Sequence, residues 1–527
     1  MALSNSRFAR RLVAVAAVAG IVAGLAACSS SPATNGSSGV ILNVASQSDD
    51  LTQVFNPFLP NAAGGSQGYF IYEPLVQINN VQIGKDIPWL AKKTTWSNSN
   101  KTLTMNLQSG VKWSDGKAFT AADVVFTFDM LKKYPALNLN GVDFSSVTAT
   151  NADTVTMTFA SPSEQTFTNI VTVPIVSQHV WSKVKNPVTY TDANPVGTGP
   201  FTLKSFSPQS YLLTANKTYW QKAPEIGGLR FITYKDNQSQ TNALVGGQAD
   251  WGGTYIADAQ KTYVGKSSDN HYWAPVAGVD GLIPNLTKWP LSDLAVRQAI
   301  SLGVNRKQVG AASDSPPATN VTGLPQPAYA ADVSPQYKGI NFKQDTQKAE
   351  STLAAAGYTK GSNGYYEKGG KTVEFSISFP ASYTDIASRV QVLVAELKDI
   401  GIKLDVATTS VSDINTLTAS GDFESTMGYP VNSAPRAFSF YNDMINPNLY
   451  YPIGKSTPTF QNIERFQNAD AKALFNEYPL ATTDAQRQQI VDKIQTIFVN
   501  ELPVIPMFYW GSYGDWSTAK VTGFPTP

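Results

Sequence analysis

One short stretch of the chain has the residue spacing of a serine hydrolase. Gly64, Ser66 and Gly68 match the Gly-x-Ser-x-Gly pattern, in which the serine is a nucleophile held on a sharp turn between a strand and a helix. The preceding residues 57–63 contain two prolines and make a poor strand, and the sequence supplies only two histidines as candidate bases. We therefore expect Ser66 to lie in a loop without catalytic function, and a secreted serine hydrolase is only a remote alternative.

The residues that a phosphate-binding loop or a metal site requires are also missing from the sequence. Residues 454–457 resemble the end of a phosphate-binding loop, but Leu449 occupies a position where that loop needs a glycine. The two histidines, His179 and His271, and the single cysteine are too few for a histidine-rich or cysteine-rich metal site. The carboxylates, Glu73 among them, show no spacing of a catalytic pair and are expected at the surface. The sequence predicts a protein that binds without a metal or cofactor and is not an enzyme.

The beginning of the chain is typical of an export signal. Residues 1–11 carry three arginines and no acid, an apolar run follows, and small residues precede Cys28. The apolar run, residues 12–27, is shorter than the roughly 18 to 20 residues that a membrane-spanning helix needs. We expect residues 1–27 to be removed and residues 28–39, which are small and polar, to form a flexible tether.

Residues 25–28, Leu-Ala-Ala-Cys, resemble the lipobox of bacterial lipoproteins. The resemblance implies cleavage before Cys28 and a lipid on its thiol, and two or more acyl chains give durable anchoring. A free cysteine that follows a signal by chance is the alternative. We expect an extracytoplasmic protein anchored through Cys28 to the outer face of the cytoplasmic membrane.

Composition narrows the class of protein further. About 500 residues remain after the leader, which is enough for two or three lobes. The formal charge of +1 becomes −2 when the three arginines of the leader are removed, so there is no electrostatic reason to expect nucleic acid. The 10 Trp, 23 Tyr and 25 Phe residues exceed what a core alone requires, and a ligand cleft lined by aromatic rings would use some of them.

Hydrophobic periodicity and capping residues predict a mixed α/β fold with α+β lobes. A first group of elements has period-two alternation or turn residues at its ends, and a second has helical periodicity with caps. We expect strands at 40–45, 102–107, 147–159 (a hairpin turning at 151–153), 210–215 and 402–406, and helices at 120–133, 236–246, 292–302, 344–356, 383–400 and 483–500.

Several stretches in combination resemble the large extracytoplasmic solute-binding proteins that include the oligopeptide- and dipeptide-binding components of ABC importers. They are Tyr72–Leu75, Trp113–Phe126, Asn194–Phe201, Val296–Leu302 with Asn305 and Arg306, and Glu501–Pro506. The resemblance implies a three-lobed clamshell. Lobe one would comprise 40–75, 196–284 and 497–527, lobe two 76–195, and lobe three 285–496.

The resemblance also implies a transport role for a monomer. A solute, either an oligopeptide or an oligosaccharide, would be enclosed between lobes one and three, with two crossing connections as the hinge. The closed form would then dock on two ABC permease subunits and their ATPases. Ligand-dependent closure is a population shift limited by the ligand's preference for the closed state.

Candidate ligand-binding residues come from the resemblance and from the aromatic content. Peptide-binding relatives use a Gly-Trp-x-x-Asp-Tyr stretch whose aspartate pairs with the peptide amino terminus; here Gly428 and Tyr429 begin the corresponding stretch and Asn432 replaces the acid. Asn432 can hydrogen-bond an ammonium group but cannot neutralise it. We therefore expect binding to depend little on a free amino terminus of the ligand, unless another carboxylate such as Asp443 has taken over the role. The remaining candidates lie in lobe one and in the C-terminal segment; they are Asn56, in a loop resembling oligosaccharide-binding relatives, and the rings of Trp251, Tyr255 and Trp510.

Overall fold

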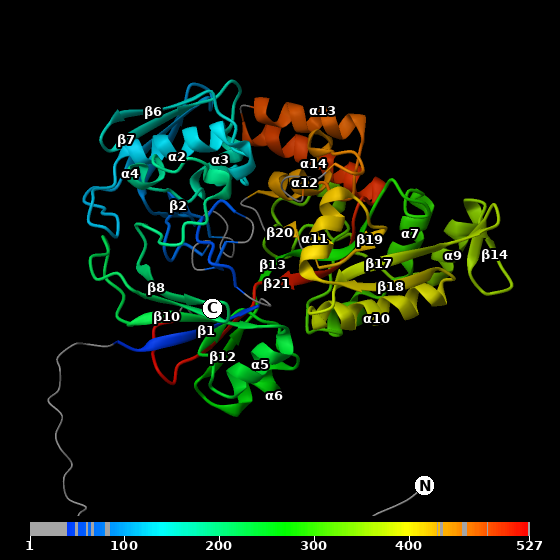
Figure 1. Ribbon diagram of the computed structural model, residues 1–527. Coiled ribbons are helices and arrows are strands. Elements are labelled where there is room, and N and C mark those ends of the chain that lie inside the picture. Colours follow the sequence, from blue (N-terminus) through cyan, green and yellow to red (C-terminus); the bar gives the residue numbers. More distant parts are fainter. Residues whose placement is uncertain are drawn as a thin grey trace, which may run out of the picture. The chain divides into compact units, whose positions relative to one another are not determined.

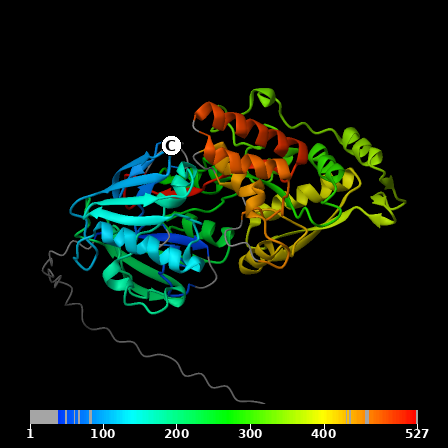
Figure 2. The same cartoon turned by 90° about the horizontal axis from the view of Figure 1, so that it is seen from above.

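The computed structural model describes residues 39–47, 51–59, 62–64, 68–79, 85–428, 431–432, 436–455, 461–481 and 483–524, which belong to one compact unit (Figure 1, Figure 2). Cys28, Ser66 and Tyr429 lie outside the described residues. Where the chain is described, no helix is both long and apolar enough to cross a membrane. The fold is mixed α/β, as predicted.

Lobe one is built on a sheet of seven described strands. Its order is β12 (Asn270–Trp273), β22 (Gly514–Ser517), β11 (Trp251–Gly252), β1 (Ile41–Gln47), β10 (Gly228–Tyr234), β9 (Ser210–Ala215) and β8 (Phe201–Ser207). Strand β1 pairs in parallel with both β10 and β11, and the other pairs are antiparallel. Helices α5 (Asn237–Val245) and α6 (Ala259–Thr262) follow β10 and β11 in the chain. The C-terminal strand therefore lies inside the sheet.

Lobe two contains a four-stranded antiparallel sheet within the described residues. Its order is β4 (Ala91–Ser97), β5 (Thr102–Leu107), β7 (Thr154–Thr158) and β6 (Ser146–Asn151), and its other elements are β2 (Val76–Gln77), β3 (Ile87–Pro88), α2 (Ala121–Lys133), α3 (Phe167–Val171) and α4 (Gln178–Trp181). Along β5 the side chains of Leu103, Met105 and Leu107 are buried and alternate with half-buried polar ones, as the period-two pattern predicted.

Lobes one and two share one apolar core, and a buried carboxylate joins them. Glu73 is 0% exposed and accepts hydrogen bonds from Trp89 Nε1 (2.7 Å), Tyr219 Oη (2.5 Å) and Trp220 Nε1 (2.9 Å). Burial raises the pKa of the Glu73 carboxyl, and the three donors oppose that rise. The expectation that Glu73 lies at the surface is wrong, because these three donors replace the water that an isolated carboxylate would need.

Lobe three contains a sheet of six described strands flanked by helices. The strand order is β18 (Lys403–Thr409), β17 (Glu374–Pro380), β19 (Ser425–Thr426), β13 (Val276–Pro284) and β20 (Val431–Asn432), with β21 (Ile505–Gly511) also paired to β13. The helices are α7 (Leu294–Gly303), α8 (Arg306–Ala311), α9 (Thr346–Ala355), α10 (Thr384–Asp399), α11 (Val411–Ser420), α12 (Ala437–Ile445), α13 (Ala469–Glu477) and α14 (Asp484–Glu501). A small sheet of β14 (Thr359–Lys360), β15 (Tyr366–Lys368) and β16 (Lys371–Thr372) completes the lobe.

The predicted helices are present, and their ends agree with the sequence to within a few residues because capping residues fix them. Thr120 and Asp123 form the predicted capping box of α2. Asp236 and Thr483 cap α5 and α14 in the same way. Gly401, with φ of 72°, follows the end of α10 in a left-handed conformation that suits glycine.

Two short connections join lobe one to lobe three. The first, at residues 274–275, runs from β12 to β13, and the second, at 512–513, runs from β21 to β22. The backbone N–H of Ser512 donates to the carbonyl of Pro275 (3.0 Å), so the two crossings lie side by side. The predicted boundaries at 284 and 496 differ from this, because β13 and β21 pair with each other and belong to the lobe-three sheet. By sheet membership, lobe three spans residues 276–511.

Candidate functional site

A cavity of about 260 Å³ lies beside the two crossing connections and is lined from both lobes. Lobe one contributes the start of α5 and the segments after β11 and before β22, and lobe three contributes β13, the start of α10, the second residue after β19 and the end of β21. The lining residues are Asn237, Gly253, Thr254, Tyr255, Asp280, Tyr383, Asp385, Ile386, Gly428, Trp510 and Tyr513. A ligand held here would touch both lobes at once.

Four aromatic rings form much of the cavity wall. Tyr255 and Tyr513 pack with ring centroids 5.9 Å apart, and Trp510 meets Tyr513 edge-on at 6.5 Å. Tyr383, at the start of α10, lines the cavity from lobe three. Burial raises the pKa of the Tyr255, Tyr383 and Tyr513 hydroxyls, which therefore stay protonated and able to donate hydrogen bonds at neutral pH. Such a wall offers apolar faces together with polar tips.

An ion pair lies under the lobe-three side of the cavity. Arg389 is 0% exposed, and its Nη1 donates to Asp385 Oδ2 (3.2 Å) while its Nη2 donates to Ser315 Oγ (2.8 Å). The guanidinium also stacks over the ring of Phe508, 3.8 Å from its centroid. The other carboxylate oxygen of Asp385 accepts from Asn237 Nδ2 of lobe one (3.4 Å). Asp385 therefore contacts both lobes as well as the cavity.

Asp280 supplies a second carboxyl group to the cavity. It is 2% exposed and accepts hydrogen bonds from the backbone N–H groups of Gly281 (2.6 Å) and Gly428 (3.1 Å). Burial raises the pKa of Asp280 to about 7, although the positive charge of Arg389 and the two N–H donors oppose the rise. The Asp280 carboxyl thus holds Gly428 against the cavity and is near its titration midpoint at neutral pH.

A third acidic group lies just behind the lobe-one wall. Asp515 is 0% exposed, and its Oδ1 accepts from the backbone N–H of Thr254 (2.8 Å). Within the described residues, Asp515 Oδ2 and the Thr254 hydroxyl have no hydrogen-bond partner. Burial raises the pKa of Asp515 to about 7. The carboxyl group that follows the second crossing connection by two residues is therefore buried, and one of its oxygens has no hydrogen-bond donor among the described residues.

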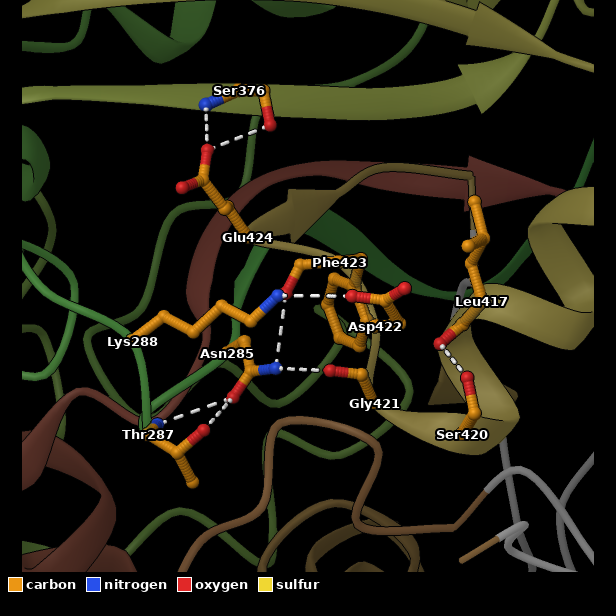
Figure 3. Close-up of polar contacts among 10 residues, drawn as sticks. All are labelled: Asn285, Thr287, Lys288, Ser376, Leu417, Ser420, Gly421, Asp422, Phe423 and Glu424. Carbon is orange, nitrogen blue, oxygen red and sulfur yellow. Dashed lines mark hydrogen bonds and ion pairs between the residues drawn. The ribbon is translucent and has the colours of Figure 1, made fainter. Parts of the chain in front are cut away.

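Polar contacts fix residues 421–424, which precede β19 and Gly428 in the chain (Figure 3). Asn285 Nδ2 donates to the carbonyls of Gly421 (2.8 Å) and Phe423 (3.0 Å). Glu424 accepts from both the backbone N–H and the hydroxyl of Ser376, each at 2.7 Å. These contacts tie residues 421–424 to β13 and β17, and so set the position at which the chain enters the cavity.

Three of the predicted ligand-binding residues, Tyr255, Gly428 and Trp510, line the cavity. Trp251 precedes the cavity segment, and its ring packs against Phe70 of the lobe-one core at 6.0 Å. Asn432 lies in β20, paired with Gly278 of β13, and Tyr429 lies outside the described residues. The binding role of all seven predicted residues, Asn56 included, stays a prediction.

Asn56 is placed differently from the expectation that it faces a ligand. It is 0% exposed; its Nδ2 donates to the carbonyls of Pro187 (3.1 Å) and Tyr190 (2.8 Å), and its Oδ1 accepts from the backbone N–H of Phe58 (3.0 Å). Both amide hydrogens are therefore occupied by the protein itself. The side chain holds its loop against lobe two, which is a structural task.

The sequence analysis did not single out Asp280, Asp385, Tyr383 or Arg389. Asp280 carried a readable signal, since it is a lone carboxylate within the otherwise uncharged strand 276–284. Asp385 and Arg389 are four residues apart on α10, a spacing that brings side chains together on a helix, but nothing in the sequence shows which face is buried. Asp443, on α12, was considered as a substitute acid; it accepts from Gln461 Nε2 (2.7 Å) and does not line the cavity.

The two histidines, considered earlier as a catalytic base or metal ligands, each contact another side chain. His179 contacts Asp115 (2.7 Å), and His271 stacks on Trp516 with centroids 5.3 Å apart. Ser66 lies outside the described residues. The described part of the chain holds no group of three or more potential metal ligands.

A second cavity of about 310 Å³ is confined to lobe three, near Arg297 and Arg465. Both guanidinium groups donate to backbone carbonyls, Arg297 to those of Leu291, Glu501 and Leu502. Because its lining comes from a single lobe, movement of the lobes would not enclose a solute there. The cavity beside the crossing connections is the candidate site.

Comparison with known proteins agrees with this arrangement. The chain is 23% identical to the oligopeptide-binding protein OppA of Bacillus subtilis strain 168 over 475 residues, which cover 83% of this chain and 82% of that protein. It is 26% identical to the nickel-binding periplasmic protein of Escherichia coli K12 over 466 residues, 83% of each.

Solved structures share the fold. A mannohexaose-bound periplasmic oligopeptide-binding protein from Thermotoga maritima superposes with a TM-score of 0.82 at 24% identity, covering 91% of this chain and 92% of that one. The oligopeptide-binding protein AppA of Bacillus subtilis, in complex with a nonapeptide, has a TM-score of 0.75 at 18% identity and covers 91% and 95%. The predicted clamshell architecture is confirmed by these likenesses.

The sequence pattern of one family accounts for most of the chain. The sequence pattern of the family described as bacterial extracellular solute-binding proteins, family 5, middle, matches residues 86–450. These residues include the whole of the lobe-two sheet and most of lobe three. The chain belongs to family 5 of the bacterial extracellular solute-binding proteins, which are components of ABC transporters.

Proposed function

We propose that this protein captures a solute outside the membrane and encloses it between lobes one and three. It then delivers the solute to two ABC permease subunits and their ATPases. A lipid on Cys28 anchors the protein to the outer face of the cytoplasmic membrane. The observation that carries the proposal is the cavity beside the paired crossing connections, lined from both lobes. A small rotation about these crossings would open or close the cavity. Binding, and not catalysis, is the proposed activity.

An oligopeptide is the first candidate ligand. The B. subtilis relatives are named for oligopeptide binding, and one is in complex with a nonapeptide. Asp280 and Asp385 both line the cavity. Because Asp385 already pairs with Arg389, Asp280 in its ionised form is the carboxylate that would pair with a peptide ammonium group. A charge-assisted hydrogen bond to an ammonium group contributes roughly 1.5 to 3 kcal/mol, so N-acetylation of such a peptide should weaken binding at least about tenfold.

An oligosaccharide is the second candidate, and a specific observation favours it. Four rings line a cavity of about 260 Å³, and the apolar faces of sugars stack on such rings. The T. maritima structure that shares the fold is in complex with mannohexaose. Carboxylates and tyrosine hydroxyls would bond the sugar hydroxyl groups.

Calorimetric titration separates these possibilities. The purified chain from residue 28 onward is titrated with a tripeptide, its N-acetylated form and mannohexaose. Trp510→Ala, which removes a cavity ring, should weaken the bound ligand about tenfold or more, whereas Trp289→Ala, which removes a ring 37% exposed in lobe three, should leave Kd unchanged. Equal effects of the two variants, or turnover of any of the three ligands, would refute the proposed site or the binding-only function.

A further inference from the structure

The described lining of the candidate cavity contains acids and no bases. Asp280 and Asp385 carry carboxyl groups, and none of the described lining residues is a lysine, an arginine or a histidine. The internal stretches outside the described ranges contain no basic residue either. Arg389 lies behind the wall, 0% exposed and paired with Asp385. Two carboxylates against one guanidinium leave an excess negative charge at the cavity when Asp280 is ionised, so the cavity favours a cation.

The Asp280 side chain and the Trp510 ring are neighbours on one face of the lobe-three sheet. Strands β13 and β21 run side by side (Figure 1), with Gly278 opposite Trp510 and Asp280 opposite Phe508. Because every second side chain of a strand points to the same face, Asp280, Phe508 and Trp510 share that face. The carboxyl group and the indole ring are therefore diagonal neighbours, a separation that an aromatic side chain can span.

Three rings meet at steep angles around the cavity. The ring planes of Tyr255 and Tyr513 are inclined at 59°, and those of Trp510 and Tyr513 at 77°. These rings are therefore adjacent walls and are not stacked on one another, and Tyr383 adds a fourth ring from α10. An aromatic face attracts a cation that lies within about 6 Å of the ring centroid. Walls at several angles suit a cation that presents its charge in several directions.

The two carboxyl groups supply charge but offer few free acceptor positions. Each oxygen of Asp280 accepts a hydrogen bond from a backbone N–H group. The oxygens of Asp385 accept from Arg389 and from Asn237. A primary ammonium group carries three N–H donors that each need an acceptor. A fully alkylated ammonium group has no N–H donor, so it can use the charge and the rings without further hydrogen bonds.

We propose that the cavity holds the fully alkylated ammonium group of an organic cation, with the charge beside Asp280 and the alkyl groups against the rings of Trp510 and Tyr513. The inference rests on the proposed function and narrows it, because it names the chemical group that the same cavity encloses during transport. This group differs from a peptide amino terminus and from a sugar, both of which bind through hydrogen bonds.

Three probes with the same hydroxyethyl tail test the proposal by calorimetric titration of the purified chain from residue 28 onward. They are choline, its neutral isostere dimethylbutanol, in which a carbon atom replaces the nitrogen, and ethanolamine, which has a primary ammonium group. Choline should bind at least about tenfold more tightly than either of the others. The comparison with the neutral isostere measures the effect of the charge, and the comparison with ethanolamine measures the effect of alkylation.

Variants show whether the rings and the carboxyl group cause this preference. Trp510→Leu keeps an apolar side chain but removes a ring, and should lower the preference for choline over the neutral isostere about tenfold, whereas Trp510→Phe should retain most of it. Asp280→Asn should also lower the preference about tenfold. Trp289→Leu, at a ring 37% exposed in lobe three, should leave it unchanged. The preference is a ratio of two Kd values for one variant, so a less stable variant still reports it.

A preference for choline that Trp510→Leu and Asp280→Asn both reduce would support the inference. Choline that does not bind, or that binds no better than the neutral isostere or ethanolamine, would overturn it. An effect of Trp510→Leu no larger than that of Trp289→Leu would overturn it as well. The proposed transport function would survive either result, because it is judged by the titrations with the tripeptide and mannohexaose.

Discussion

Removing the positive charge beneath the cavity should destabilise lobe three by a predictable amount. The Arg389 guanidinium is 0% exposed and pairs with Asp385, whose side chain is 11% exposed, at 3.2 Å. Arg389→Met keeps the length of the side chain but leaves the Asp385 carboxylate buried without its partner. Breaking a buried ion pair in this way costs about 3 to 5 kcal/mol, because one charge stays desolvated and uncompensated. We expect that loss in the free energy of unfolding of lobe three.

Urea denaturation at pH 7.5 of the wild type, Arg389→Met, Asp385→Asn and the double variant measures the coupling between the two residues. The double variant should lose at least about 2 kcal/mol less than the sum of the single variants, since it leaves no charge unpaired. Glu350→Gln, in an exposed pair, should cost about 1 kcal/mol or less. Additive losses, within about 0.5 kcal/mol, would show that Arg389 and Asp385 do not depend on each other and would refute the reasoning.

Three further predictions concern other groups. Burial raises the pKa of Asp515 to about 7, so the folded protein binds a proton at this carboxyl more tightly than the unfolded chain does. The contribution of Asp515 to the free energy of unfolding should therefore fall by up to about 1.4 kcal/mol per pH unit between roughly pH 4 and 7 and level off above pH 7. Asp515→Asn should reduce that slope in urea titrations across this range. Asn56→Ala should cost about 2 to 4 kcal/mol of unfolding free energy by calorimetry and leave ligand Kd unchanged; a weakened Kd with little loss of stability would restore its predicted binding role. Cys28→Ala should move the expressed protein from the membrane to the soluble fraction, and firm retention on the membrane would contradict the lipid anchor.

The elements of the fold were predictable where local chemistry decides them. The Thr120 and Asp123 capping box and the alternation in 102–107 specify α2 and β5 without reference to the rest of the chain. The lobe boundaries were not predictable in this way. The sequence of strand 276–284 is compatible with the sheet of either lobe. The strand belongs to lobe three because it pairs with 505–511, a strand far along the chain.

The candidate site was predictable in part. Tyr255, Gly428 and Trp510 reach the cavity because they adjoin the two crossings or the family stretch. Asn56 was read as a ligand group, yet an asparagine before a proline also favours a turn in which its side chain bonds the backbone two residues on, as it does here to Phe58. Asp385 reaches the cavity through the packing of α10, which long-range contacts determine.

The strand order of lobe one has a consequence for how the protein is made. Strand β22 is formed by residues 514–517, close to the end of the chain, yet it lies between β12 and β11 in the sheet. Its two neighbours do not pair with each other, so β12 has no place in the sheet until residues 514–517 have emerged. Lobe three, whose strands all precede residue 512, can finish first. During synthesis lobe one, although it contains β1, is therefore completed after lobe three, and a chain ending at residue 512 would keep the strands of lobe three but leave β12 without its partner in the lobe-one sheet.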